Sequence, residues 1–333
     1  MNNRAKFLIS VLFIAAIILT IGLTRFYFDV TKNNAKVSSD EKVVNVLQSY
    51  GDMRVFQNAN GLCGVIDADG AVLIEPEWLE ILDVTPDVVL VSRRMKSSVL
   101  VGGVDYEENV VIPFVFRSFQ ELTPGLYAAT VDADGLVLLY DASYQMMLPS
   151  AYESAAYQEN TLLLRAENGS FSYTFTEGSL KLHRAELQCA IGTEKLNWRV
   201  SNQVYLADLA EDDLRRMNRS VSAYISMLID DDFTDLPEIA QTDSIGGLTR
   251  PGTMPDAKFD RVSDFSLTKA DPDVYGVDAY DFAFTAEYHL TDEAAQTVHI
   301  HLFFRRDAEN DMILSSANLN FQGTERPAPT DAE

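Results

Sequence analysis

The residues best suited to metal chemistry in this chain are Glu287, His289, His299 and His301. Each of the two pairs is separated by one residue, so in a strand both members would project from the same face. Imidazole and carboxylate groups that converge in this way could bind zinc. Apolar residues such as Ile300 occupy the alternating positions, however, and these are expected to face the core. We therefore expect the four residues to face solvent, and we predict no metal site.

No other pattern in the sequence is typical of catalysis. A nucleophile elbow, a phosphate-binding loop and a paired-carboxylate signature are all missing from the 333 residues. Cys63 and Cys189 lie among apolar residues, which indicates buried free thiols; a disulfide between them, or a metal or redox role, is the alternative. We predict no catalytic residues and no cofactor.

Composition bounds the function further. With 333 residues the chain is long enough for about two globular domains, and its 47 % hydrophobic residues can form large cores. Its net charge of −24 would repel a phosphate backbone, and no basic stripe offsets this charge, so we expect no nucleic-acid partner.

The amino terminus has the pattern of a membrane anchor. Residues 7–23 carry no charge and no proline, and aromatic residues follow at 26–28. We therefore predict a cytoplasmic head at 1–6, a transmembrane helix at 7–28 and a linker at 29–42. A cleaved signal peptide is the alternative. The predicted location is the cell membrane, spanned once, with the domains after the span outside the cytoplasm.

Three segments share one layout over the following 130 residues. In each, an aspartate is followed seven residues later by an apolar residue and eleven residues later by an aromatic residue. The aspartates are Asp67, Asp105 and Asp141, and the aromatic residues are Trp78, Phe116 and Tyr152. Such spacing predicts stacked β-units, with the aromatic side chains packed between neighbouring units. The "DADG" segment at 67–70 lacks the spacing of a calcium loop and reads as a hairpin turn.

This layout resembles the WG-repeat (KWG-repeat) family of bacterial proteins over about residues 50–180. "GLCGVIDADG" at 61–70, "IPFVF" at 112–116 and "LPSAY" at 148–152 carry the resemblance. The tryptophan that names the family is replaced by Cys63, Val101 and Val137. The resemblance implies an all-β domain of stacked β-meander units, solenoid-like or propeller-like, at 43–182. It implies no catalytic residues, because the family motif is structural.

The remainder predicts an α+β domain at 183–322, followed by a disordered tail at 323–333. Apolar residues between Leu214 and Leu228 recur at helical spacing, and two later segments, 280–290 and 297–306, alternate as strands do. A helix followed by a short helix and an antiparallel sheet resembles the NTF2-like superfamily in element order. That resemblance implies a cone with a pocket.

From these observations we expect an exported, membrane-anchored bacterial envelope protein that acts by binding or scaffolding through its β-repeat surface. Its partner would be a protein or a cell-wall polymer. An enzyme of hydrolase or isomerase type, with its pocket inside the carboxy-terminal cone, is the alternative; a scaffold that faces the cytoplasm is another. Convergent acidic or histidine residues in the cone would favour an enzyme, and a filled apolar interior would favour binding.

Overall fold

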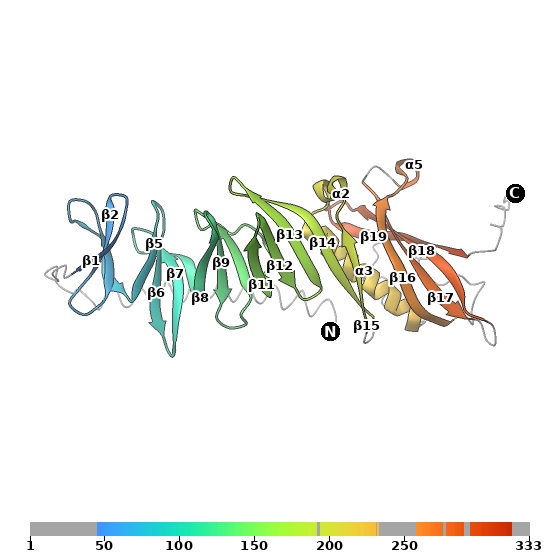
Figure 1. The fold of residues 1–333 in the computed structure, drawn as a ribbon, viewed down its shortest axis with the longest axis horizontal. Coiled ribbons are helices and arrows are strands. Elements are labelled where there is room, and N and C mark those ends of the chain that lie inside the picture. Colours follow the sequence, from blue (N-terminus) through green and yellow to red (C-terminus); the bar gives the residue numbers. More distant parts are fainter. Residues whose placement is uncertain are drawn as a thin grey trace. The chain divides into compact units, whose positions relative to one another are not determined.

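The computed structural model describes residues 45–191, 194–230, 232, 258–275, 278–289 and 294–321. They divide into two compact units. The first contains Phe175–Leu180 and the described residues up to Asn160; the second contains Thr161–Thr174 and the described residues from Lys181 onward. Figure 1 shows the elements in chain order.

The first compact unit consists of short antiparallel strands joined by turns. They are β1 (Asn45–Tyr50), β2 (Met53–Gln57), β3 (Cys63–Ile66), β4 (Val72–Trp78), β5 (Glu80–Val84), β6 (Val89–Met95), β7 (Ser98–Val104), β8 (Val110–Thr123), β9 (Leu126–Val131), β10 (Val137–Asp141) and β11 (Ser154–Gln158). One sheet has the order β1-β2-β3-β4, and another has the order β10-β9-β8-β7-β6-β5.

Neighbouring repeats are joined by a shared strand. The first half of β8 pairs with β7 and its second half pairs with β9. In the preceding repeat the two halves are separate strands on either side of Leu79: β4 pairs with β3, and β5 pairs with β6. The same register recurs in three repeats, in the pairs Cys63–Trp78, Val101–Phe116 and Val137–Tyr152.

The recurring aspartates close identical turns. The Asp67 side chain accepts hydrogen bonds from the backbone N–H groups of Asp69 and Ala71 at 2.9 and 2.8 Å. Asp105 and Asp141 each accept from the residues two and four positions ahead in the same way. The third residue after each aspartate has a positive φ, with Gly70 at 89°. This is a hairpin turn with a bulge, and the aspartate supplies its side-chain acceptor.

The recurring aromatic residues are buried. Trp78, Phe116 and Tyr152 are 2 %, 1 % and 1 % exposed. The Trp78 ring stacks on Phe114, with centroids 5.7 Å apart, in a cluster that also contains Val89 from the next repeat. Phe116 likewise clusters with Ala129 and Tyr140 of the following repeat. Trp78 and Phe116 therefore lie where one repeat meets the next, at a junction that neither repeat could bury alone.

Glycine follows Cys63 and Val101 because the backbone of the neighbouring strand and an aromatic ring both lie close there. A Cβ at Gly64 would approach the Ile74 carbonyl oxygen to 2.6 Å and the Phe56 ring to 2.8 Å, and a Cβ at Gly102 would approach the Ile112 carbonyl oxygen and the Phe114 ring to 2.8 Å. A larger residue would have to displace the neighbouring strand as well as the ring, so the close approach explains the glycine in these two repeats.

The second compact unit combines strands with helices. Its elements are β12 (Thr161–Ala166), β13 (Gly169–Thr176), β14 (Ser179–Ile191), β15 (Glu194–Val200), α2 (Gln203–Asp208), α3 (Glu211–Asp230), β16 (Lys258–Lys269), α5 (Pro272–Tyr275), β17 (Tyr280–His289), β18 (Gln296–Arg306) and β19 (Met312–Phe321). Strands β12 to β15 are neighbours in chain order, and so are β16 to β19.

Helix α3 forms the centre of this unit. Its apolar stripe is fully buried, with Leu214, Val221 and Ile225 at 0 % exposure, and α3 packs on β16 and β19. Asp213 accepts a hydrogen bond from the Ala210 N–H at 2.9 Å, which caps the first turn of the helix. Figure 1 shows α3 beside the β16–β19 strands.

The fold class predicted from the sequence is wrong. The described residues are mostly antiparallel strands with three helices, and none of these helices is long and apolar enough to cross a membrane. The predicted transmembrane, single-pass, signal-anchored protein thus has no support in the described part of the chain. The predicted head at 1–6, anchor at 7–28, linker at 29–42 and tail at 323–333 lie outside the described residues.

Candidate functional site

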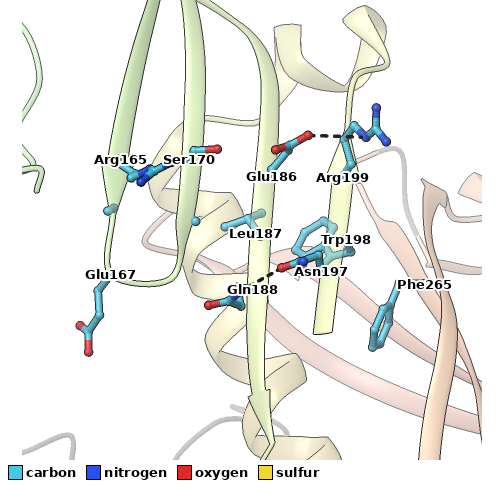
Figure 2. A pocket seen from close by; sticks show the side chains of 12 residues that line it. Arg165, Glu167, Ser170, Glu186, Leu187, Gln188, Asn197, Trp198, Arg199 and Phe265 are labelled. Atoms are coloured by element: carbon cyan, nitrogen blue, oxygen red, sulfur yellow. Dashed lines mark hydrogen bonds and ion pairs between the residues drawn. The ribbon is translucent and has the colours of Figure 1, made fainter. Parts of the chain in front are cut away.

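A groove of about 680 Å³ lies on the sheet formed by β12 to β15 in the second compact unit. Side chains from all four strands line it, and Phe265 from β16 borders it. Figure 2 shows these side chains. The lining residues are Arg165, Ala166, Glu167, Gly169, Ser170, Glu186, Leu187, Gln188, Asn197, Trp198, Arg199 and Phe265.

Strand alternation places polar side chains on the groove side of this sheet. In β14, Ala185, Leu187 and Cys189 are buried, while Glu186 and Gln188 between them are only partly buried. The buried face packs towards α3, because the buried side chains of Cys189 and Trp198 both donate hydrogen bonds to Asn218 Oδ1 of that helix, at 3.2 and 2.7 Å. The opposite face is therefore left for the polar side chains, as expected for a sheet with one covered face.

Opposite charges and amides form pairs across the strands. Glu186 lies beside Arg199 in the ladder, with 3.9 Å between the Glu186 Oε1 and the Arg199 Nε, and Glu186 also forms an ion pair with Arg184. Gln188 Nε2 donates to Asn197 Oδ1 at 3.1 Å. Figure 2 shows both contacts. These side chains are substantially exposed, so their charges and amides remain available to a ligand.

An aromatic border ends the groove at Phe265. The register of β16 shifts between Ser263 and Ser266, and Asp264 has φ 57°, which marks a bulge. Such a bulge redirects the side chain beside it. Phe265 is half-buried and packs against the rings of Phe282 and Phe284, with centroids 5.8 and 6.0 Å away.

Polar and charged side chains make up most of the groove lining. Glu186 and Arg199 lie opposite each other on neighbouring strands, and Arg165 and Glu167 add further charge to the lining. Arginine, amide and carboxylate groups can donate and accept hydrogen bonds at spacings set by the strands, about 4.8 Å apart. This arrangement suits a polar ligand laid across the strands.

The predicted histidine cluster is placed on β17 and β18, on the face away from α3. The Nδ1 atom of His299 lies 3.1 Å from Thr285 Oγ1, and that of His289 lies 2.7 Å from Asp260 Oδ2. The Nδ1 atom of His301 lies 2.9 Å from Asp281 Oδ2. Each histidine thus has a separate partner. Among the described residues no group of three histidine, cysteine or acidic side chains is arranged to hold a metal ion, and Glu287 joins none.

Both cysteines are buried free thiols in the structure. Burial raises the pKa of Cys63 and of Cys189, so neither favours the reactive thiolate form. Cys189 donates to Asn218 Oδ1 at 3.2 Å.

The groove was not predicted from the sequence. The signal in the sequence was the segment "HRAELQC" at 183–189, in which polar and apolar residues alternate from Arg184 onward. That signal marks a half-buried strand, but it cannot say which polar side chains from other strands will lie beside it.

Comparison with known proteins shows no family. No family model matches the chain, and no curated protein matches it. Among solved structures, one described as Kluyveromyces lactis Hsv2 complete loop 6CD matches with 8 % identity and a TM-score of 0.25, covering 82 % of this chain and 85 % of that chain. A likeness of this size carries no argument about fold or function.

Proposed function

We propose that this chain is a non-catalytic binding or scaffolding protein that contacts its partner through its β-sheet surfaces, including the groove on β12 to β15. The single observation that carries this proposal is the interior of the β16–β19 sheet. The inward side chains there are buried and apolar, among them Phe282, Ile300, Leu302 and Phe304 at 0 % exposure.

A filled interior supports binding over the predicted alternative, an enzyme with its pocket inside this sheet. An active site needs a concave space with convergent polar groups. On β17 and β18 the polar groups alternate with the buried ones, so they project to the other face. The WG-repeat and NTF2-like resemblances remain part of the proposal and supply no active-site residue.

The partner class that we propose is a protein or a cell-wall polymer, because both offer hydrogen-bonding groups at regular spacing. The experiment compares the full chain with a groove variant, Gln188→Ala with Asn197→Ala, in binding to purified wall polymer and, separately, to protein captured by cross-linking. We expect the groove variant to bind markedly less.

The matched control is Lys195→Ala. Lys195 is exposed, lies on the same strand as Asn197 and does not line the groove. Equal binding by the parent, the groove variant and the control would contradict the groove as a contact. Turnover of a substrate by the purified chain would contradict the non-catalytic function itself.

A further inference from the structure

The groove on β12 to β15 offers a ligand hydrogen bonds and very little aliphatic surface. Its apolar lining residues Ala166, Leu187 and Trp198 are buried, so among the described residues that line it no aliphatic side chain is exposed. The hydroxyl of Ser170 and the amide of Gln188 both donate and accept hydrogen bonds. A peptide gains specificity from pockets that accept its side chains. A ligand covered with hydroxyl groups matches this lining better.

The polar groups of the groove repeat from strand to strand. Arg165 of β12 lies opposite Ser170 of β13, and Glu186 of β14 lies opposite Arg199 of β15. The four strands are neighbours in one sheet, so the polar surface extends across three strand spacings, or about 14 Å. A surface of this kind fits an extended ligand that presents the same groups repeatedly, as the successive rings of a linear polysaccharide do.

Charge indicates that the ligand is neutral. Two arginines, Arg165 and Arg199, and two glutamates, Glu167 and Glu186, line the groove, so its charges cancel. The whole chain carries a net charge of −24. An anionic ligand would be repelled by this field, and a cationic ligand would be drawn to the acidic surface outside the groove. An uncharged ligand is the class that the groove can bind in preference to the rest of the molecule.

Phe265 adds an aromatic ring at one end of the groove. Figure 2 shows this ring on the β15 side of the groove. The rings of Phe282 and Phe284 pack against it and hold it in place, while it stays only half-buried. The face of an aromatic ring is electron-rich. The C–H face of a sugar ring carries partial positive charge, and it can stack on such a ring while the hydroxyl groups at its rim bond to polar side chains.

We propose that the groove binds a neutral linear polysaccharide. The amide and charged side chains of β12 to β15 bond to its hydroxyl groups, and Phe265 stacks on one of its sugar rings. This inference rests on the proposed function, because it names the partner class of the same groove.

The test is isothermal titration calorimetry of the full chain with two neutral oligosaccharides, cellohexaose and chitohexaose, at low and high salt. We expect at least one of them to bind, with an affinity that salt does not change, because a neutral ligand has no charge to screen. Phe265→Leu keeps an apolar side chain but removes the flat ring, and it should weaken binding by about tenfold. Phe265→Tyr should bind like the parent.

The matched control is Phe259→Leu, the same substitution on the same strand at a buried ring that does not line the groove. It should leave the affinity unchanged, and circular dichroism should show all variants folded. A parent chain that binds neither oligosaccharide would overturn the proposal, and so would an affinity that falls with salt or that Phe265→Leu leaves unchanged.

Failure of this inference and failure of the proposed function give different results. If neither oligosaccharide binds but a cross-linked protein partner is lost in Gln188→Ala with Asn197→Ala, the groove is a protein contact and only the polysaccharide is wrong. If an oligosaccharide binds and chromatography shows that the chain cleaves it, the polysaccharide is confirmed as ligand and the non-catalytic function is wrong.

Discussion

Asn218 should be the polar residue on which the packing of α3 against β14 and β15 depends most. It is 3 % exposed. Its Oδ1 accepts a hydrogen bond from Trp198 Nε1 at 2.7 Å and another from the Cys189 thiol at 3.2 Å. Its Nδ2 donates to the Gln188 carbonyl at 3.0 Å. One amide thereby satisfies groups on two strands.

Replacing this residue, Asn218→Ala, would remove all three contacts. The Trp198 N–H and the Gln188 carbonyl would lose their partner inside the protein, and each buried group left without one costs about 1–3 kcal/mol. A cavity of about 30 Å³ borders Asn218, and a water entering there could recover part of this energy. We therefore expect the free energy of unfolding to fall by about 3 kcal/mol.

The assay is urea unfolding followed by far-ultraviolet circular dichroism. Asp230→Ala is the control, because Asp230 belongs to the same helix, is exposed and lies away from the cavity beside Asn218; its effect should stay within about 0.5 kcal/mol. A double-mutant cycle with Trp198→Phe should give a coupling energy of about 1 kcal/mol or more. If Asn218→Ala costs no more than the control, or if the coupling is zero, the reasoning about this buried amide is refuted.

Three further changes test other parts of the molecule. Phe116→Ala should lower the free energy of unfolding by about 3–5 kcal/mol, because it removes a buried ring and leaves a cavity. Phe119→Ala, at a half-buried ring, should lower it by clearly less, and equal urea midpoints for the two variants would show that Phe116 is no junction residue. Burial raises the pKa of Tyr140 from 10.0 to about 12, so between pH 10 and 12 the folded chain keeps a proton that the unfolded chain loses. The free energy of unfolding should therefore be unaffected below pH 10 and decline between pH 10 and 12. Tyr140→Phe should remove about 3 kcal/mol of that decline, and an unchanged alkaline unfolding curve would contradict the shift. Burial raises the pKa of Cys63 and Cys189, so at mildly alkaline pH iodoacetamide should label them slowly in the folded chain and quickly in urea. Mass spectrometry measures the labelling, and rapid labelling of the native chain would contradict the burial of the two thiols.

Local patterns in the sequence predicted the elements that local chemistry determines. The apolar stripe from Leu214 to Leu228 predicted a helix, and α3 covers it. The alternation in 280–290 and 297–306 predicted strands, and β17 and β18 confirm it. Both signals are periodic, and periodicity depends only on which side chains must leave water together.

The features that the sequence did not predict depend on which strands become neighbours. Arg165 and Glu186 border one groove although twenty residues of chain separate them, and no spacing rule connects the two. The segment Thr161–Thr174 falls inside the repeat domain predicted at 43–182, yet the structure assigns it to the second compact unit. Local turn chemistry specifies a hairpin, but it does not specify the core against which that hairpin packs.

The turn at Asp307 shows that the aspartate and the aromatic residue of the repeat pattern have different structural roles. Its side chain accepts the N–H groups of Glu309 and Asp311 at 2.9 Å, and Asn310 has φ 67°, so its geometry is that of the turns at Asp67 and its equivalents. Yet it joins β18 to β19, outside the repeats, and the residue eleven positions on is Asn318 rather than an aromatic. The aspartate is therefore a general device for closing a hairpin. The buried aromatic residue that follows it at fixed spacing marks the junction of two repeats, because only that side chain needs a neighbouring unit to cover it.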